Sequence, residues 1–193
     1  MVTPLTRRSP PLSMSALSSA FSGRILMVGC GSVGQTVLPL LLRELGLGPD
    51  RVRVIAADER GREVAAAHDV RFERLTLTPE CIAAELAARL QPGDFLLNLS
   101  VEVASLELLR CASGLGALYL DTGIEPWPGG YTDPRLSLAE RSNQAFRAQA
   151  LALRRELRPG SPTAVICQGA NPGLVSQLVK AAALELARAV GLE

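Results

Sequence analysis

The sequence predicts an α/β protein in which a parallel sheet is covered by helices on both faces. Three observations predict this class: short apolar runs alternate with segments of helical spacing, the links between them are short, and the first apolar run ends in glycines. Alternation of strands and helices favours parallel pairing, because each helix returns the chain to the same edge of the sheet. A chain of 193 residues, 48% of them hydrophobic, is long enough to bury such a core.

Five strands and four helices are expected before residue 122. The run 24–28 is largely apolar, as expected of a strand that is buried on both faces. A later helix is expected to begin with Thr78 as N-cap and Pro79 at its first position. The strands are expected at 24–28, 52–57, 70–75, 94–98 and 117–121, and the helices at 32–45, 59–67, between 78 and 92, and 103–115.

The organisation changes after Asp121. Residues 125–131 are rich in proline and glycine and predict a stiff, irregular segment. A long helix is expected from Ser137, because Ser137 and Glu140 have the spacing of a capping box. A further strand is expected at 163–167.

The last predicted helix follows Asn171 and Pro172, which match an N-cap and a first helical position. Its apolar positions are expected to be buried, and they are Val175, Val179, Ala182, Leu186 and Val190. The predicted divisions are a disordered tail (1–22), a dinucleotide-binding domain (23–122) and the beginning of an incomplete catalytic region (123–193).

The glycines after the first strand match a dinucleotide-binding turn. Gly29, Gly31 and Gly34 form a G-x-G-x-x-G pattern that follows a predicted strand and opens a predicted helix. Glycines at these positions permit a tight turn, close approach of a pyrophosphate and close packing of the helix. The phosphates would lie at the helix N-terminus, where free N–H groups favour anions. This context predicts a Rossmann-type, doubly wound sheet, although a glycine turn without a ligand stays open as an alternative.

Asp58 closes the second predicted strand, 24 residues after Gly34. A carboxylate here would accept hydrogen bonds from the adenosine ribose, which predicts NAD as the cofactor. Arg60 and Arg62 could instead accommodate the 2′-phosphate of NADP, although a solvated surface is the preferred interpretation of both. The predicted cofactor-binding residues are Gly29, Gly31, Ser32, Val33, Gly34, Asp58 and Asn98.

Three further residues are candidates for the chemistry. Asn98 ends the fourth strand, at the edge where ligands bind to open parallel sheets, but it could equally be a turn residue. Glu125 and Trp127 together suit an alkylammonium ion, through ion pairing and cation–π attraction, whereas a rigid loop with a buried tryptophan is the alternative. Cys30 is interpreted as a small spacer within the turn.

Charge and composition exclude several classes. Lys and Arg total 20 against 19 Asp and Glu, so there is no electrostatic reason to expect a nucleic-acid partner. No apolar run is long enough to span a bilayer, and we expect a cytoplasmic protein with reduced cysteines. The four cysteines lack metal-ligand spacing and His68 is the only histidine, so no metal site is expected.

Four stretches of the chain resemble the bacterial homospermidine synthases, which belong to the saccharopine dehydrogenase-like group. The resemblance rests on the combination of NLSV (98–101), LYLDT (118–122), EPWPG (125–129) and GANPG (169–173), together with the glycine turn. It extends over nearly the whole chain after residue 22. Members of that family are much longer, so the resemblance implies an amino-terminal portion, which in a full-length form could be a homodimer.

The resemblance implies a reaction and a set of roles. In that family, tightly held NAD takes hydride from a carbon of putrescine next to nitrogen, the imine exchanges with a second amine and releases ammonia, and the new imine is reduced to homospermidine. It implies that Asn98 and Glu125 lie near the reacting amine and that Trp127 packs on an ammonium group or shapes its pocket. Two alternatives stay open: a saccharopine dehydrogenase-like oxidoreductase acting on an amino acid or a carboxylated polyamine, and a non-catalytic NAD-binding fragment.

Overall fold

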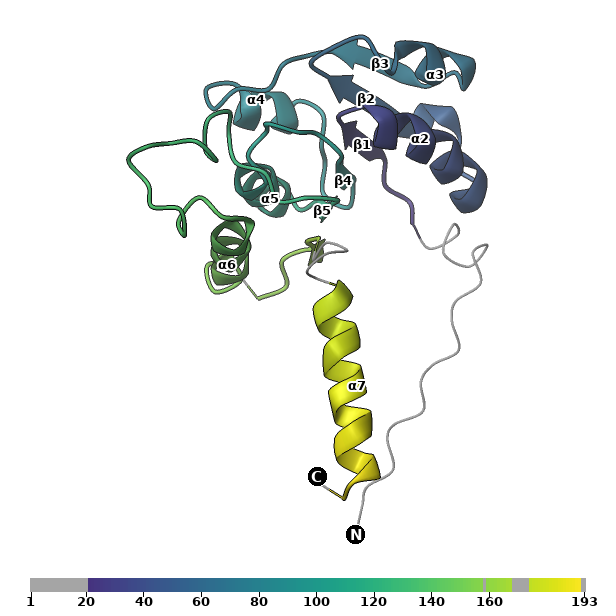
Figure 1. Ribbon diagram of the computed structural model, residues 1–193. Helices are drawn as coiled ribbons and strands as arrows, with labels where there is room; N and C mark the ends of the chain where they lie inside the picture. The colour runs from purple at the N-terminus through teal and green to yellow at the C-terminus, as the bar shows by residue number, and fades with distance from the viewer. Residues whose placement is uncertain (1–20, 158, 168–173, 192–193) are drawn as a thin grey trace.

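A six-stranded parallel sheet forms the centre of the molecule (Figure 1). The computed structural model describes residues 21–157, 159–167 and 174–191. The strands are β1 (Ile25–Val28), β2 (Val52–Ala56), β3 (Arg71–Arg74), β4 (Phe95–Asn98), β5 (Leu118–Asp121) and β6 (Ala164–Val165). The helices are α2 (Ser32–Leu45), α3 (Arg62–Ala67), α4 (Ile82–Ala87), α5 (Ser105–Gly114), α6 (Asn143–Leu153) and α7 (Val175–Ala189), with a 3₁₀ turn η1 (Pro49–Arg51).

The strand order is β3-β2-β1-β4-β5-β6, so the sheet is doubly wound. The chain starts at the centre with β1, runs outward to β3, and then crosses back to place β4 on the other side of β1. The predicted fold class is therefore confirmed. The winding direction reverses between β1 and β4, and ligands bind at this point in open sheets of this kind.

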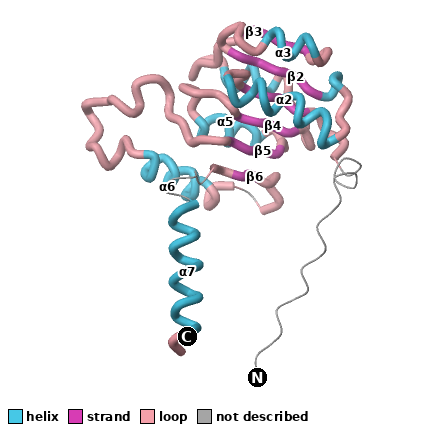
Figure 2. The backbone as a smooth tube through the Cα atoms, turned by 45° about the vertical axis from the view of Figure 1, so that its right-hand side comes forward, coloured by secondary structure: helices cyan, strands magenta, loops and turns pink. Residues whose placement is uncertain are grey.

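The core consists of two apolar layers, one on each face of the sheet. Alternate residues of β1 point to opposite faces, because side chains in a strand alternate in direction. Leu26 and Val28 pack against residues of α4 and α5, whereas Ile25 and Met27 pack against residues of α2. Figure 2 shows helices on both sides of the central strands. This burial on both faces explains why the strand is apolar at every position.

Helices α4 and α6, whose starts are predicted from capping residues, begin later than those residues indicate. Ser137 and Glu140 do exchange the two hydrogen bonds of a capping box, but they close only a turn. Helix α6 begins at Asn143, because the hydroxyl of Ser142 caps the N–H of Ala145 at 3.2 Å. Similarly, the carbonyl of Thr78 accepts a helical bond from Ile82, but the regular part of α4 begins at Ile82 itself.

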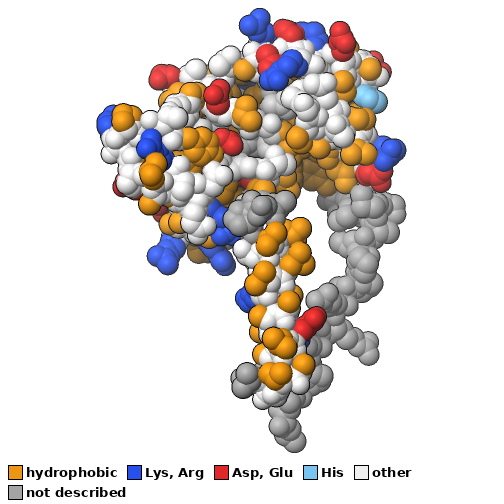
Figure 3. Space-filling view, in the orientation of Figure 1, with side chains coloured by type: hydrophobic (Ala, Val, Ile, Leu, Met, Phe, Trp, Pro, Cys, Tyr) orange, Lys and Arg blue, Asp and Glu red, His pale blue; other side chains and the backbone are white. Residues whose placement is uncertain are grey.

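The prediction that α7 is buried is wrong. None of its described residues is buried, and Val179 and Leu186 are 63% and 65% exposed. Figure 1 shows α7 projecting away from the sheet, and Figure 3 shows hydrophobic side chains along its surface. The apolar spacing of the sequence is real, but no described part of the chain covers the face that it creates. Asn171 and Pro172, predicted to start this helix, lie outside the described residues.

Residues outside both predicted domain limits contact the sheet. Phe21, at the end of the predicted tail, packs edge-to-face on Phe95 with ring centroids 6.4 Å apart. Residues 1–20 of that tail lie outside the described residues. At the other limit, β6 pairs with β5 although it belongs to the stretch predicted as a separate region. One sheet therefore contains strands from both sides of residue 122.

Candidate functional site

A hollow of about 370 Å³ lies at the carboxyl ends of β1, β2 and β4. This is the edge where the winding of the sheet reverses. The hollow is lined by residues 28–33, 55–58, 75–77 and 99–103, together with Arg60 and Pro128. The predicted residues Gly29, Gly31, Ser32, Val33 and Asp58 are all among them, so the fold brings the glycine turn and the acid to one place.

The glycine turn is held closely against the neighbouring strand end. Gly29 has a φ of +91°, and a Cβ there would lie 2.7 Å from main-chain atoms of Leu99 and Ser100. A Cβ at Gly34 would lie 2.9 Å from the carbonyl oxygen of Gly29. Distances below about 3 Å cannot be accommodated without main-chain movement, so both positions require glycine. Gly31 differs, because a Cβ there would meet no atom within 4 Å and would enter open space.

The amino end of α2 faces this open space without a side-chain cap. Its N-cap is Gly31, which supplies no capping oxygen, and the first turn contains no acidic residue. The first N–H groups of a helix lack intrahelical partners and carry the positive end of the helix dipole. An uncapped end beside a bare glycine main chain is therefore suited to an anion such as a pyrophosphate. The geometry of the turn fits the dinucleotide that the sequence predicts.

Asp58 lies just after β2, with 46% of its side chain exposed. Its Oδ2 accepts hydrogen bonds from Nε of Arg60 at 2.8 Å, and its Oδ1 accepts the N–H of Arg60 at 2.9 Å. These bonds from Arg60 hold the pKa of Asp58 below its ordinary value. The carboxylate is thus ionised at neutral pH and oriented by its neighbour, as an acceptor for two ribose hydroxyls would need to be.

The sequence interpretation missed Gly61, which shapes the same turn from the other side. A Cβ on Gly61 would lie 2.2 Å from the sulfur of Cys30. The thiol of Cys30 is buried at this contact, and burial, followed by the charge of Asp58, raises its pKa. A protonated, enclosed thiol has the spacer role predicted for it. The sequence did contain a signal for this residue, because Gly61 follows Asp58 and Arg60 in the loop after β2.

Asn98 is buried beneath the hollow and bonded within the chain. Its Nδ2 donates to Tyr119 Oη at 3.3 Å and to Ser105 Oγ at 3.4 Å. Its Oδ1 accepts from the N–H and the hydroxyl of Ser100, at 3.1 and 2.6 Å. Both ends of the amide are engaged, so Asn98 positions the 99–103 loop that forms one wall of the hollow.

This network continues to a second strand end. Tyr119 Oη donates to Oδ2 of Asp121 at 3.0 Å, and Oδ1 of Asp121 accepts the N–H of Cys167 at 2.7 Å. Burial raises the pKa of Asp121, although these two donors partly offset it. Ser105 extends the network by accepting the N–H of Glu125 at 2.9 Å. A buried set of polar groups therefore joins the ends of β4 and β5 to the segment predicted to carry the chemistry.

Glu125 and Trp127 do not line the hollow; Pro128 alone represents their segment there. Trp127 is half-buried against the core, and its Nε1 donates to Glu107 Oε1 at 2.8 Å. Glu125 is also half-buried and adjoins Tyr131; burial of that tyrosine, and then the charge of Glu125, raise the pKa of Tyr131 to about 12. Glu125 and Trp127 thus lie on one segment next to the hollow, but they have different immediate neighbours.

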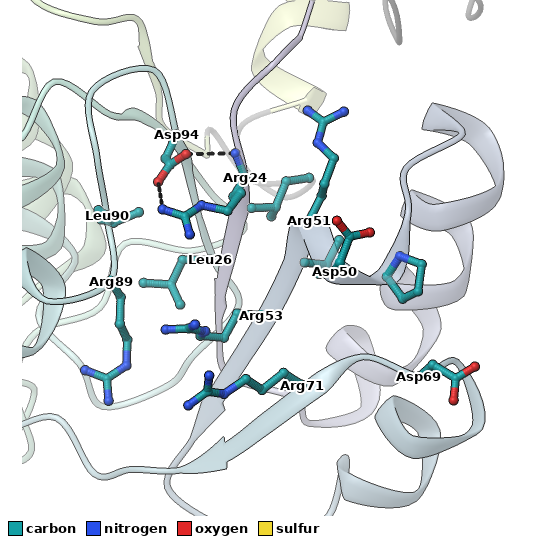
Figure 4. Close-up of a pocket in the computed structure, with 13 residues that line it drawn as sticks. Arg24, Leu26, Asp50, Arg51, Arg53, Asp69, Arg71, Arg89, Leu90 and Asp94 are labelled. Carbon is teal, nitrogen blue, oxygen red and sulfur yellow. Dashed lines mark hydrogen bonds and ion pairs between the residues drawn. The ribbon is translucent and has the colours of Figure 1, made fainter.

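A second hollow, of about 230 Å³, lies at the opposite, amino-terminal edge of the sheet (Figure 4). Arg53, Arg71 and Arg89 extend toward the same region in this view, and all three form ion pairs with Glu73, which lies just outside the lining. Arg24 pairs with Asp94 at 3.6 Å. This edge is rich in charge, but four of its guanidinium groups already have carboxylate partners, and that of Arg51 donates to the carbonyls of Phe21 and Gly23.

Neither a metal site nor a membrane helix is found in the described ranges. Within residues 21–157, 159–167 and 174–191, no three His, Cys, Asp or Glu side chains gather as metal ligands would. Among the helices described there, none has the length and apolarity to cross a bilayer.

The comparisons with known proteins agree with this fold. A family model described as the saccharopine dehydrogenase NADP binding domain matches residues 25–165, from the first residue of β1 to the last of β6. The homospermidine synthase of Blastochloris viridis is 42% identical over 173 residues, which make up 88% of this chain and 36% of the relative. That of Mesorhizobium japonicum is 36% identical over 175 residues, covering 89% and 36%.

A solved structure of a homospermidine synthase also matches this chain. The crystal structure of the homospermidine synthase from Legionella pneumophila in complex with NAD superimposes with a TM-score of 0.71 at 33% identity. The match covers 90% of this chain and 35% of that one. The chain thus spans about a third of the length of the relatives that it matches. Because the family model covers well over half of its residues, the chain belongs to the saccharopine dehydrogenase NADP-binding domain family.

Proposed function

We propose that this chain binds NAD in the hollow at the carboxyl edge and serves as the coenzyme-binding part of a homospermidine synthase. The observation that carries the proposal is the uncapped start of α2, beside the open side of Gly31 and within the same hollow as Asp58. The pyrophosphate would rest on the first N–H groups of α2, and the ribose would donate to Asp58. The similarity to homospermidine synthases, one of them solved with NAD, supports this assignment.

The proposed substrate is putrescine. Bound NAD would supply a hydride acceptor and donor, so that an amine is oxidised and an imine is later reduced without net redox change. The chain's own contribution is to hold the coenzyme, through the wall that Asn98 positions, and to present the segment that follows β5. We place the carboxylate of Glu125 near an ammonium group of the substrate, and we place Trp127 as the side chain that shapes that pocket.

A chimera tests the function directly. The aligned segment of the Blastochloris viridis relative would be replaced by residues 1–193 of this chain, and the purified chimera incubated with putrescine and NAD. Mass spectrometry should detect homospermidine, with release of ammonia. A chimera that folds and binds NAD but forms no homospermidine would contradict the substrate assignment.

The role of Glu125 has its own test within that chimera. Glu125→Gln should raise KM for putrescine by about tenfold, because one charge-assisted contact is lost, and should leave NAD affinity unchanged. Glu156→Gln, an exposed residue near the end of α6, is the matched control and should change neither value. Equal KM values in all three proteins would contradict the role.

The alternative with a carboxylated substrate receives less support. It calls for an arginine from the segment before α6 beside the nicotinamide. The two candidates are Arg135 and Arg141. Arg135 pairs with Asp133 at 2.7 Å with its own side chain 86% exposed, and neither arginine lines the hollow. No second function is therefore proposed.

A further inference from the structure

Ser105, the first residue of α5, is a buried polar residue whose hydroxyl is not used by its own helix. Its side chain and main chain together are only 3% exposed. Serine at the start of a helix commonly caps the free N–H groups of the first turn. Here the N-cap position is Ala104, and no side chain caps the helix. The hydroxyl of Ser105 is therefore directed to groups outside α5.

That hydroxyl joins the end of β4 to the segment that follows β5. It donates to the carbonyl of Gly123 at 3.2 Å and accepts the N–H of Glu125 at 2.9 Å. It also accepts from Nδ2 of Asn98, at 3.4 Å. A serine hydroxyl has one proton to donate and two lone pairs to accept with, so its whole hydrogen-bonding capacity is used at this one junction.

The main chain of Ser105 completes a clamp on Glu125. Its N–H donates to the carbonyl of Glu125 at 2.9 Å, so both main-chain polar groups of Glu125 are bonded to the same residue. Pro128, three residues further along, is the part of this segment that lines the hollow. On the other side of the junction, Asn98 holds the 99–103 wall through Ser100. The wall and the Glu125 segment thus meet at one buried hydroxyl.

We infer that Ser105 is a positioning residue that sets the Glu125 segment against the wall of the coenzyme hollow. This inference rests on the proposed roles of the hollow and of Glu125. Ser105 does not line the hollow, so it acts through Glu125 and not by contact with a ligand. It adds that a substrate contact depends on a buried hydroxyl 20 residues away in the sequence.

The first test is a double-mutant cycle in the chimera. Ser105→Ala should raise KM for putrescine by about threefold to tenfold, because the carboxylate of Glu125 is no longer held in place. NAD affinity should fall by less than about threefold, since Asn98 keeps both of its bonds to Ser100. Adding Ser105→Ala to Glu125→Gln should raise KM no further, because both substitutions act on one contact. Effects on KM that simply multiply would overturn the inference.

Two other variants serve as controls. Ser113→Ala removes a serine hydroxyl from the same helix, and that hydroxyl makes no hydrogen bond within the described ranges, so KM should not change. Ser105→Cys keeps a side chain of similar size whose thiol forms weaker hydrogen bonds, so its effect should lie between those of serine and alanine. Ser105→Cys also replaces Ser105→Ala in the cycle if the alanine variant does not fold.

The second test needs neither coenzyme nor substrate. Amide hydrogen exchange of residues 1–193, followed by NMR, should show a slow Glu125 N–H in wild-type protein. In Ser105→Ala that N–H should exchange at least about tenfold faster, because its acceptor is lost, whereas the N–H of Ser100 should stay slow. Thermal unfolding of each variant checks that the fold is retained. Unchanged exchange at Glu125 in the folded variant would overturn the inference.

The outcomes separate the two proposals. A chimera that forms no homospermidine contradicts the proposed function, and the exchange measurement still decides the role of Ser105. If Glu125→Gln raises KM for putrescine but Ser105→Ala does not, the inference is overturned and the proposed function stands.

Discussion

The two edges of the sheet differ in how their polar groups are satisfied. The amino-terminal edge concentrates arginines, and Glu73 alone pairs with three of them. The carboxyl edge has fewer charges, but it leaves the start of α2 uncapped beside Gly31. Charge that is already paired contributes to stability, whereas main-chain donors without partners can hold a ligand. The proposed binding edge is therefore distinguished by unmet hydrogen-bonding capacity and not by density of charge.

The largest effect is expected at Gly29, where the carboxyl edge depends on the fold itself. Gly29→Ala would force a side chain into main-chain atoms 2.7 Å away, at a positive φ. Backbone strain of this kind costs about 1–3 kcal/mol before the overlap is counted. Thermal or urea unfolding should show a large loss of stability together with loss of NAD binding. An unchanged unfolding midpoint would show that the close approach to Leu99 and Ser100 is not real.

A smaller loss, confined to stability, is expected at the opposite edge. Arg89 is 15% exposed and bonds to Glu73 and Glu85. Arg89→Met should lower the free energy of unfolding by about 1–2 kcal/mol, because the two carboxylates lose charged donors, and should leave NAD affinity unchanged. Arg43→Met, which breaks an exposed pair with Glu44, is the control and should have no measurable effect. A change of NAD affinity in Arg89→Met would contradict the separation of the two edges.

Gly31→Ala should show the opposite pattern, in which NAD affinity falls and the stability of the fold is unchanged. A Cβ there meets no atom of the chain, so unfolding should be unaffected. The methyl group would enter the space assigned to the pyrophosphate, and NAD affinity should fall by about tenfold, which corresponds to about 1.4 kcal/mol. Calorimetry and thermal unfolding on the same sample distinguish the two quantities. Full NAD affinity in this variant would place the phosphates elsewhere.

The smallest effect concerns pH and the amino-terminal edge. Burial raises the pKa of Glu73, but the guanidinium groups of Arg89, Arg71 and Arg53 outweigh it, so the net shift is downward. Stability from this carboxylate is present above its ordinary pKa of about 4.3 and is lost as the pH falls through the lower value in the folded protein. Glu73→Gln should therefore unfold with a weaker pH dependence than wild type across that acidic window. If the free energy of unfolding had the same pH dependence in both proteins, the stabilising role of the ion pairs around Glu73 would be contradicted.

Much of the coenzyme edge could be predicted because local sequence determines it. The glycine turn, the acid after β2 and the alternation of strands and helices each have signals within a few residues. The burial of Asn98 and its bonds to Tyr119 and Ser105 could not be predicted, because these partners lie 21 and 7 residues away and meet only when β4 and β5 pair.

The errors at the carboxyl-terminal end have a different cause. The spacing of Val175, Val179 and Leu186 correctly predicts an amphipathic helix, but periodicity cannot tell whether a partner surface is present. In α2 the same kind of pattern buries Leu38 at 0% exposure, whereas in α7 every described residue remains accessible. The late start of α6 shows that a capping box can close an isolated turn when a better N-cap, Ser142, follows it.

Calorimetric titration of folded, nucleotide-free wild-type protein with NAD tests the central claim most directly. We expect saturable binding at one site per chain, weaker in Gly31→Ala and unchanged in Arg89→Met. Absence of any binding of NAD or NADP by the folded protein would contradict the assignment of the carboxyl edge as a coenzyme site.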